Sequence, residues 1–317
     1  MRVKPKILSQ PDYFLVAVVA ILVVGGLVML SSTSSDLGKI KFGDSYFYLK
    51  HQIKYGLAFG LAGFLFTANF YYRRLVKLSL ILLILSIVLL LLVFSPLGFG
   101  SGGADRWLEL GSLTIQPAEI VKLTFIVYLA AWLSSRKERA KSFWKGFVPF
   151  VFFSGAIALL LVLQPSTGTM LIIMGSALIV YFLSGANLKF ILGSLVLGAG
   201  AFVLLVNLTP YRLERITAFI NPERDSLGSS YHLNQALIAI GSGGLKGIGF
   251  GQSTTKVKYL PEPIGDSIFA VIAEELGFIG AISLVILFLL VILRSFRIAV
   301  RIPDPFGRLL GFGFGSL

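Results

Sequence analysis

Long apolar stretches recur along this chain of 317 residues and constrain its fold more than any other feature. A helix needs about 20 apolar residues to cross a hydrocarbon core ~30 Å thick. Charged residues make up only 14% of the chain, against about a quarter in an ordinary soluble domain. The sequence therefore predicts an integral membrane protein, whose expected spans are 13–32, 52–69, 75–95, 117–134, 147–163, 168–184, 188–208 and 266–293, with a ninth beginning near Phe306.

These spans are expected to be helices. Backbone N–H and C=O groups in lipid must be satisfied within a helix or a closed barrel, and the stretches lack the period-two alternation of barrel strands. We predict an all-α, polytopic fold that forms a single domain over residues 1–317, with its ninth span cut off at Leu317. The chain has no Cys and only two His, so no disulfide and no cluster of metal ligands can be predicted.

The distribution of charge predicts the orientation in the membrane. If the N-terminus is cytoplasmic, the inner segments are 1–12, 70–77, 135–146, 185–189 and 294–308. They hold 16 Lys and Arg and 3 acidic residues, whereas the rest of the chain holds 12 of each. The whole net charge of +13 then lies on the cytoplasmic side, as the positive-inside rule requires. Membrane topology explains the basic charge better than nucleic-acid binding does.

Two longer loops, 96–116 and 209–265, face outward in this orientation. Loops on a rigid scaffold often carry function, so we expect the chemistry on this side. In the first loop, Arg106 and Trp107 are either site residues or an interfacial anchor. Just after it, Glu119 and Lys122 are three apart on one helix face, which suits a functional pair or an ion pair that merely neutralises itself.

The second loop and the segment LQPSTGTM at 163–170 are polar as well. Gln164 could hydrogen-bond a sugar, or the Gln-Pro turn could only start the next helix. The stretch GSGGLKGIGFG, 241–251, lacks the order of a phosphate-binding loop, and its glycines favour tight turns or close backbone approach. His232 is more often an ordinary hydrogen-bonding residue than a ligand in such a setting.

Four carboxylates lie in the stretch YLPEPIGDSIFAVIAEELGFIG, 259–280, where a polar loop becomes apolar. Asp266 falls at or near the start of the eighth span. It either caps that helix or serves as a base at the boundary between water and lipid. Glu274 and Glu275 lie about two turns deeper and point in different directions, so at least one must face protein or a polar cavity. The fourth carboxylate is Glu262.

Several motifs together resemble the SEDS family (shape, elongation, division and sporulation), and its cell-division branch most of all. They are the RW...L...QPAEIVKL block, LQPSTGT, YHLNQALIAIGSGGLKGIGFG and YLPEPIGDSIFAVIAEELG. The resemblance implies ten spans, so that this chain lacks the last one and a Gly- and Ser-rich segment. Many members have His-Thr-Asp-Phe where this chain has Ile264-Gly265-Asp266-Ser267, but the Asp is kept.

The resemblance implies a peptidoglycan glycosyltransferase that polymerises lipid II on the outer face of the bacterial cytoplasmic membrane, with a class B penicillin-binding transpeptidase as partner. Its essential acidic residue corresponds to Asp266, the expected base of an inverting transfer. The expected substrate-binding residues are Arg106, Trp107, Gln116, Glu119, Lys122, Gln164, Arg215, Lys256 and Glu262.

The leaving undecaprenyl pyrophosphate needs its charge stabilised by Lys or Arg, or by a divalent cation such as Mg or Mn. Lys122 and Arg215 are the first candidates, followed by Arg106 and Lys256. Two other functions remain open. One is a lipid II flippase, which the charge-poor span centres disfavour mildly. The other is a non-catalytic scaffold that recruits the transpeptidase and other division proteins.

Overall fold

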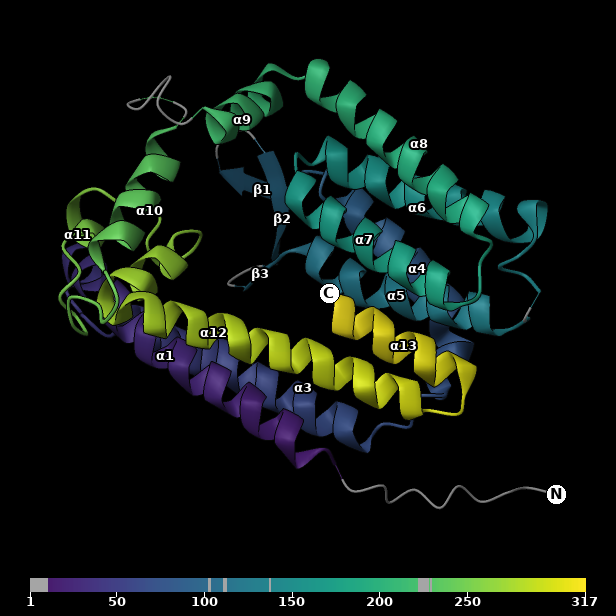
Figure 1. Cartoon of the computed structure of the whole chain (residues 1–317), viewed down its shortest axis with the longest axis horizontal. Coiled ribbons are helices and arrows are strands. Elements are labelled where there is room, and N and C mark those ends of the chain that lie inside the picture. The colour runs from purple at the N-terminus through teal and green to yellow at the C-terminus, as the bar shows by residue number, and fades with distance from the viewer. Residues whose placement is uncertain (1–10, 102–103, 111–112, 137, 222–227, 229) are drawn as a thin grey trace. The chain divides into compact units, whose positions relative to one another are not determined.

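The computed structural model describes every residue except 1–10, 102–103, 111–112, 137, 222–227 and 229. Helices dominate the described part of the chain, and one small sheet is present (Figure 1). This confirms the all-α prediction. The backbone packs into two compact units, one formed by residues 1–69 and 203–291 and the other by residues 70–202 and 292–317. We call them unit 1 and unit 2 and describe each by itself. That the chain is one functional domain stays a prediction.

Unit 1 begins with the 30-residue helix α1, Tyr13–Phe42. A second helical run follows as α2 (Phe47–His51), the π-helical turn η1 (Gln52–Leu57) and α3 (Ala58–Asn69). The later part of unit 1 contains α9 (Pro210–Ile220), α10 (Tyr231–Ser242) and α11 (Thr255–Lys258). It ends with most of α12, Ile268–Arg301.

Unit 2 is a helical bundle with α5, Pro117–Ser134, at its centre. This helix packs against α4 (Arg74–Leu92), α7 (Thr167–Leu183) and α13 (Pro305–Ser316). The remaining helices are η2 (Phe143–Phe147), which continues into α6 (Val148–Leu163), and α8, Leu188–Asn207, up to residue 202.

The central position of α5 follows from its composition. It has the lowest mean hydropathy of the six helices that are long and apolar enough to cross a membrane, yet the largest buried share. A helix enclosed by other helices does not need lipid-facing apolar residues, and it can carry small and polar ones. The hydroxyls of Thr124 on α5 and Ser86 on α4 are hydrogen-bonded to each other inside the bundle.

Each predicted span coincides with a helix. Six of these helices, α1, α4, α5, η2 with α6, α8 and α12, are long and apolar enough to span a bilayer, and α7 is a shorter apolar helix. The chain is thus a multi-pass membrane protein, although nine crossings are not confirmed as a count. The helix of the first predicted span continues beyond residue 32 to Phe42, and Ser32, Thr33 and Ser34 on it are buried.

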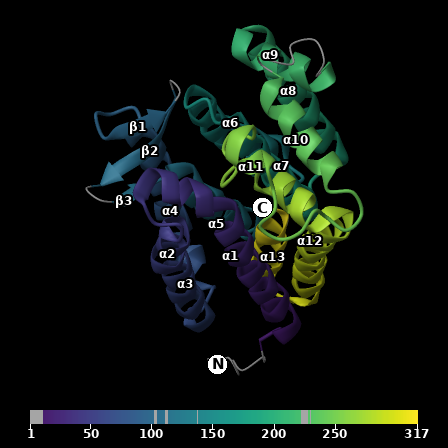
Figure 2. The same cartoon turned by 90° about the vertical axis from the view of Figure 1, so that its left-hand side faces the viewer.

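The two long loops contain regular structure that the sequence patterns did not predict. Residues 96–116 include the antiparallel strands β1 (Gly98–Ser101), β2 (Ala104–Leu110) and β3 (Leu113–Ile115), in that order. The strands lie beside the end of α5 where that helix begins (Figure 2). The backbone pairs Gly98 with Leu108 and Leu108 with Ile115, and Leu108 is buried. The loop at 209–265 contains α9, α10 and α11.

Candidate functional site

Helix α12 is interrupted after two turns. Gly277 has φ 69° and ψ −168°, which are not helical angles. A Cβ atom added to Gly277 would lie 2.2 Å from the backbone nitrogen of Gly247 and 2.6 Å from the carbonyl oxygen of Leu245. The loop that follows α10 therefore lies directly against the break. The close backbone approach predicted for the glycines of 241–251 is confirmed at Gly243 and Gly247, where an added Cβ would lie 2.0 Å from the carbonyl oxygen of Ala273 and 2.1 Å from that of Glu275.

The loop provides hydrogen bonds to the backbone groups that the break leaves without helical partners. The N–H groups of Ile248 and Gly249 donate to the carbonyls of Glu274 and Glu275 at 3.0 and 3.1 Å. On the other side of the break, the N–H of Phe278 donates to the carbonyl of Gly244 at 2.8 Å. A helix at membrane depth can be interrupted only if such groups find partners in the protein.

Both glutamates of the first half of α12 are buried and bonded. The carboxylate of Glu274 accepts hydrogen bonds from the hydroxyls of Ser253, at 2.6 Å, and Thr255. The carboxylate of Glu275 accepts from Lys256 Nζ at 2.8 Å and from the hydroxyl of Ser32. The Lys256 and Glu275 side chains are 3% and 0% exposed. The prediction that at least one of these acids faces protein is confirmed, and both do.

This network binds three elements together. Lys256 Nζ also lies 3.1 Å from the carbonyl oxygen of Ser32 on α1 and 3.2 Å from that of Gly251. Its ammonium group is thus surrounded by oxygen atoms of unit 1. This environment favours a positioning role for Lys256 over direct contact with a substrate, since a substrate oxygen would have to displace one of these partners.

Asp266 lies on a turn just before α12, which begins at Ile268. The turn is fixed from several sides. The N–H groups of Gly265 and Ser267 donate to the carbonyl of Glu262, whose φ of 45° is rare for a residue with a side chain. The hydroxyl of Ser267 donates to the carbonyl of Pro261 and lies 2.8 Å from Nε2 of His232 on α10.

The carboxylate of Asp266 is exposed at the surface of this fixed turn. Within the described part of the chain no donor is hydrogen-bonded to it, so the helix-cap alternative has no bond to support it. An exposed carboxylate on a rigid support can accept a proton from an incoming hydroxyl group.

Two further predicted site residues of unit 1 are exposed. The side chain of Glu262 points outward from the strained position that closes the turn. Arg215 lies on α9, with its guanidinium carbon 4.5 Å from the ring centre of Tyr211. This cation–π contact keeps the guanidinium group ordered at the surface.

The other predicted residues belong to unit 2, where the side chain of Arg106 joins the sheet to the turn between α6 and α7. Its Nε and one terminal nitrogen donate to the carbonyls of Gln164 and Pro165 at 3.2 and 2.7 Å. Gln164 itself is 2% exposed and donates to the carbonyl of Leu90 at 2.7 Å. These contacts show how the sheet is held, while sugar binding by either residue stays a prediction.

The first turn of α5 carries the remaining residues. Gln116 is its N-cap residue and is half-buried, and its side chain makes no capping hydrogen bond. Glu119 and Lys122 form the expected ion pair, with 2.8 Å between Oε2 and Nζ and with side chains 55% and 23% exposed. The indole of Trp107 on β2 is 41% exposed. The pair and the indole are all accessible to a ligand.

No group of three or more His, Asp or Glu side chains among the described residues could hold a metal ion. A divalent cation bound together with the leaving pyrophosphate stays a prediction.

Residues 12–317 match the family described as "Cell cycle protein", which groups FtsW, RodA and SpoVE. The chain belongs to the FtsW/RodA/SpoVE family. This match covers nearly the whole sequence and confirms the resemblance inferred from the motifs.

Similar proteins of the FtsW/RodA/SpoVE family carry informative names. Stage V sporulation protein E of Bacillus subtilis is 37% identical over 310 residues, which cover 98% of this chain and 84% of that protein. The probable peptidoglycan glycosyltransferase FtsW of Saccharophagus degradans is 39% identical over 313 residues, covering 96% and 80%.

Solved structures of the family have the same fold. A chain from a peptidoglycan synthase complex that coordinates polymerization and crosslinking superposes with a TM-score of 0.72 at 28% identity, covering 96% of this chain and 83% of that one. Rod shape determining protein RodA of Thermus thermophilus gives a TM-score of 0.69 at 28% identity, covering 98% and 82%.

Several residues of the site were not predicted from the sequence. Ser32, Ser253 and Thr255 provide hydroxyl donors to the buried glutamates, and Ser267 fixes the turn. The interpretation of His232 as an ordinary hydrogen-bonding residue is confirmed by its contact with Ser267. The run of Ser and Thr at 31–35 is a sequence signal that could have predicted hydroxyl donors to a buried partner. A polar run placed at the end of a membrane helix often faces a buried partner.

Proposed function

We propose that this chain is a peptidoglycan glycosyltransferase that polymerises lipid II on the outer face of the bacterial cytoplasmic membrane during cell division. The observation that carries the proposal is the exposed carboxylate of Asp266, which has no partner among the described residues and lies on a turn held by Pro261, Glu262 and His232. The names of the relatives support the type of reaction. A family likeness alone would not assign a reacting group, whereas this geometry offers one.

In the proposed reaction, Asp266 removes the proton from the 4-hydroxyl of the acceptor N-acetylglucosamine. The hydroxyl oxygen forms a bond to C1 of the lipid-linked N-acetylmuramic acid, and the bond from C1 to the pyrophosphate oxygen breaks. Undecaprenyl pyrophosphate leaves with the electron pair. A single base without a nucleophilic second carboxylate suits inversion at C1.

The leaving pyrophosphate requires cationic groups. Arg215 is our first candidate, since its guanidinium is exposed and ordered on Tyr211. Lys122 is the second, because it is accessible although paired with Glu119. Lys256 is given a positioning role instead, since its ammonium group binds Glu275 in the interior of unit 1.

The orientation and the partner are part of the same proposal. The basic segments support an orientation with the N-terminus in the cytoplasm and the turn of Asp266 outside. We also propose that a class B penicillin-binding transpeptidase binds this chain and cross-links its product, supported by the similar chain found in a synthase complex that joins polymerization to crosslinking.

The decisive experiment replaces Asp266 by Asn in the purified protein together with its transpeptidase partner. Loss of a general base should lower the rate of lipid II polymerisation by about 10²–10⁴-fold. Asp44→Asn is the matched control. It makes the same chemical change at an Asp of unit 1 that forms an ion pair with the exposed Lys50. An Asp266→Asn protein that melts normally and polymerises at the wild-type rate would refute the base assignment.

One observation favours transport as a second candidate function. Interrupted helices such as α12 are also common in transporters, where the freed backbone groups line the substrate site. If the chain is a flippase, the Asp266→Asn variant should still move fluorescent lipid II across the bilayer of liposomes. A polymerase does not need to transport lipid II. A scaffold without activity of its own would leave polymer synthesis to the partner alone.

A further inference from the structure

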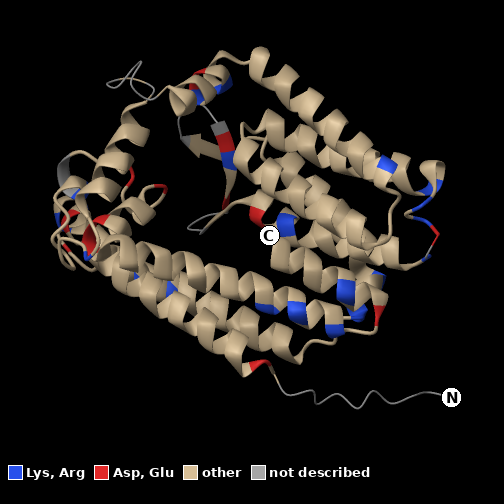
Figure 3. Ribbon diagram, in the orientation of Figure 1, with Lys and Arg blue, Asp and Glu red and all other residues tan. Residues whose placement is uncertain are grey.

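A cavity of about 530 Å³ that is open to the surface lies at the connection between α5 and α6 in unit 2. It lies at the end of α5 opposite to Gln116 and Glu119, so it is separate from the residues proposed for glycosyl transfer. Lys and Arg residues gather along this connection (Figure 3). The described residues that line the cavity are Trp132, Arg136, Glu138, Arg139, Ser142 and Lys145.

The lining of the cavity is mostly positively charged, and Arg139 in it is held by several contacts. One guanidinium nitrogen of Arg139 donates to the carbonyl of Trp132 and to the hydroxyl of Ser135, both at 2.7 Å. The same guanidinium lies over the indole of Trp132, 5.4 Å from the ring centre. These contacts hold Arg139 in one orientation before any ligand arrives.

Two cations of the lining are available for a ligand. The side chains of Arg136 and Lys145 are exposed and have neither an ion pair nor a hydrogen bond with any described residue. The one carboxylate of the lining, Glu138, is 3.7 Å from Lys141. A ligand of complementary charge would be an anion, and the forked N–H groups of arginine suit phosphate oxygens in particular.

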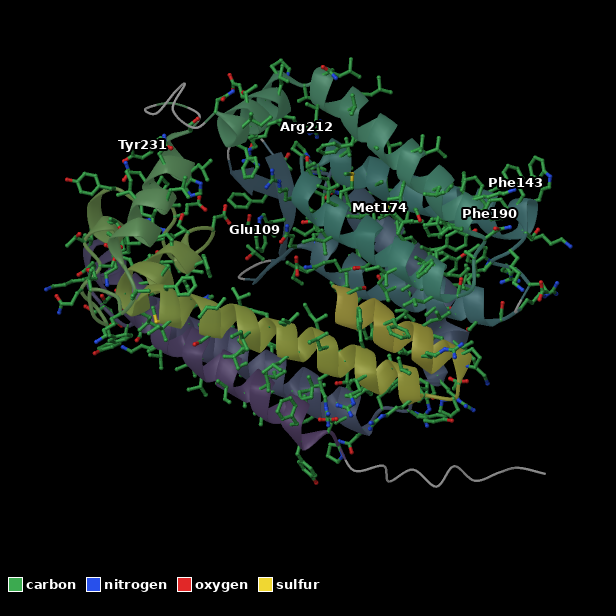
Figure 4. All side chains as sticks on the ribbon, in the orientation of Figure 1. Glu109, Phe143, Met174, Phe190, Arg212 and Tyr231 are labelled. Atoms are coloured by element: carbon green, nitrogen blue, oxygen red, sulfur yellow. The ribbon has the colours of Figure 1, made fainter. Side chains whose placement is uncertain are left out.

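The surroundings of the cavity suit a lipid. Next to Lys145, the side chains of Phe143 and Trp144 are 45% and 75% exposed, as is common for aromatic residues in the headgroup region of a membrane. The rings of Phe143 and Phe190 are 6.0 Å apart and join this region to α8 (Figure 4). Leu188, Leu192 and Val196 of α8 are exposed and offer an apolar face to acyl chains.

We propose that this cavity binds the headgroup phosphate of an anionic phospholipid in the membrane leaflet at this end of unit 2. Arg136 and Lys145 contact the phosphate oxygens, Arg139 fixes the wall, and the acyl chains pack beside Phe143 and α8. Basic pockets of this kind at the cytoplasmic end of membrane helices suit anionic headgroups. The site does not depend on the proposed glycosyl transfer, and with the proposed orientation it faces the cytoplasmic leaflet.

The test measures lipid retention by the purified full chain in a neutral detergent, with native mass spectrometry as the readout. The probes are phosphatidylglycerol, phosphatidylcholine and glycerol 3-phosphate. The cavity variant combines Arg136→Gln with Lys145→Gln, and the control combines Arg74→Gln with Lys77→Gln, which removes an exposed Arg and an exposed Lys of unit 2 that do not line the cavity.

We expect the wild type to retain one phosphatidylglycerol in preference to phosphatidylcholine. Loss of two charge-assisted contacts should weaken this binding by about 10-fold or more in the cavity variant, with less than about threefold change in the control.

Equal losses of lipid binding in both variants, or no preference for the anionic lipid, would overturn the proposal. So would displacement of the lipid by glycerol 3-phosphate at equal concentration, because the site would then bind free phosphate. A cavity variant that keeps its lipid but no longer binds an acidic peptide would overturn it as well.

Discussion

At the scale of single residues, Gly277 decides the local structure of the site. Its φ is positive, and the backbone of residues 245–247 lies so close that a side chain at this position would overlap with it. In the sequence, Gly277 stands inside an apolar stretch predicted as one span, with nothing to mark a break. The break became visible only with the loop that lies against it.

Gly277→Ala tests this reading. The added methyl group would meet backbone atoms of Gly247 and Leu245, and φ is positive, so we expect a loss of roughly 3 kcal/mol or more in the free energy of unfolding. Thermal melting in detergent measures it. The control is Gly241→Ala in α10, where an added Cβ has no atom within 4 Å. There we expect the free energy of unfolding to stay the same or to rise by up to about 1 kcal/mol. Equal stability of the two variants would contradict the structure at the break.

At the scale of elements, the buried ion pair connects α11, α1 and α12. Lys256 and Glu275 are bonded at 2.8 Å with almost no exposure, and both bind Ser32. Removing one partner leaves a buried charge uncompensated, which costs about 3–5 kcal/mol. Replacing both by apolar side chains removes that cost, so the pair fixes the geometry of the elements more than it adds to stability.

A double-mutant cycle of Lys256→Met and Glu275→Leu measures this. Each single variant should lose about 3–5 kcal/mol, and the double variant should recover a large part of the loss. The pair of Lys50 and Asp44 is the control, since its side chains are 69% and 38% exposed and Lys50→Met should cost at most about 1 kcal/mol. Single variants at Lys256 and Glu275 that cost no more than the control would show that the buried pair does not hold these elements.

At the scale of the whole molecule, the order of spans and basic loops predicts which segments share a side of the membrane. Glu109 on β2 precedes α5, whereas Lys141 follows that helix, so the two lie beyond opposite ends of it (Figure 4 labels Glu109). Because the chain has no Cys, one cysteine can be introduced at a time without background.

In intact spheroplasts, a membrane-impermeant maleimide should label Glu109→Cys and should label Lys141→Cys only after the membrane is opened. Both side chains are exposed, so burial does not limit the reaction. Labelling of Lys141→Cys from outside would reverse the proposed orientation and place the turn of Asp266 in the cytoplasm.

The sequence by itself determined the helical class, the positions of the long apolar helices and the candidate carboxylates. Each of these depends on neighbours along the chain, because lipid requires backbone groups to be satisfied within one segment and apolar length is a local property. Only the tertiary structure decided what the polar residues contact. Glu275 binds Ser32, 243 residues away in the sequence, and Arg106 binds the carbonyls of Gln164 and Pro165. Such partners are set by packing between distant segments, so no local pattern could separate a buried ion pair from a carboxylate left free to react.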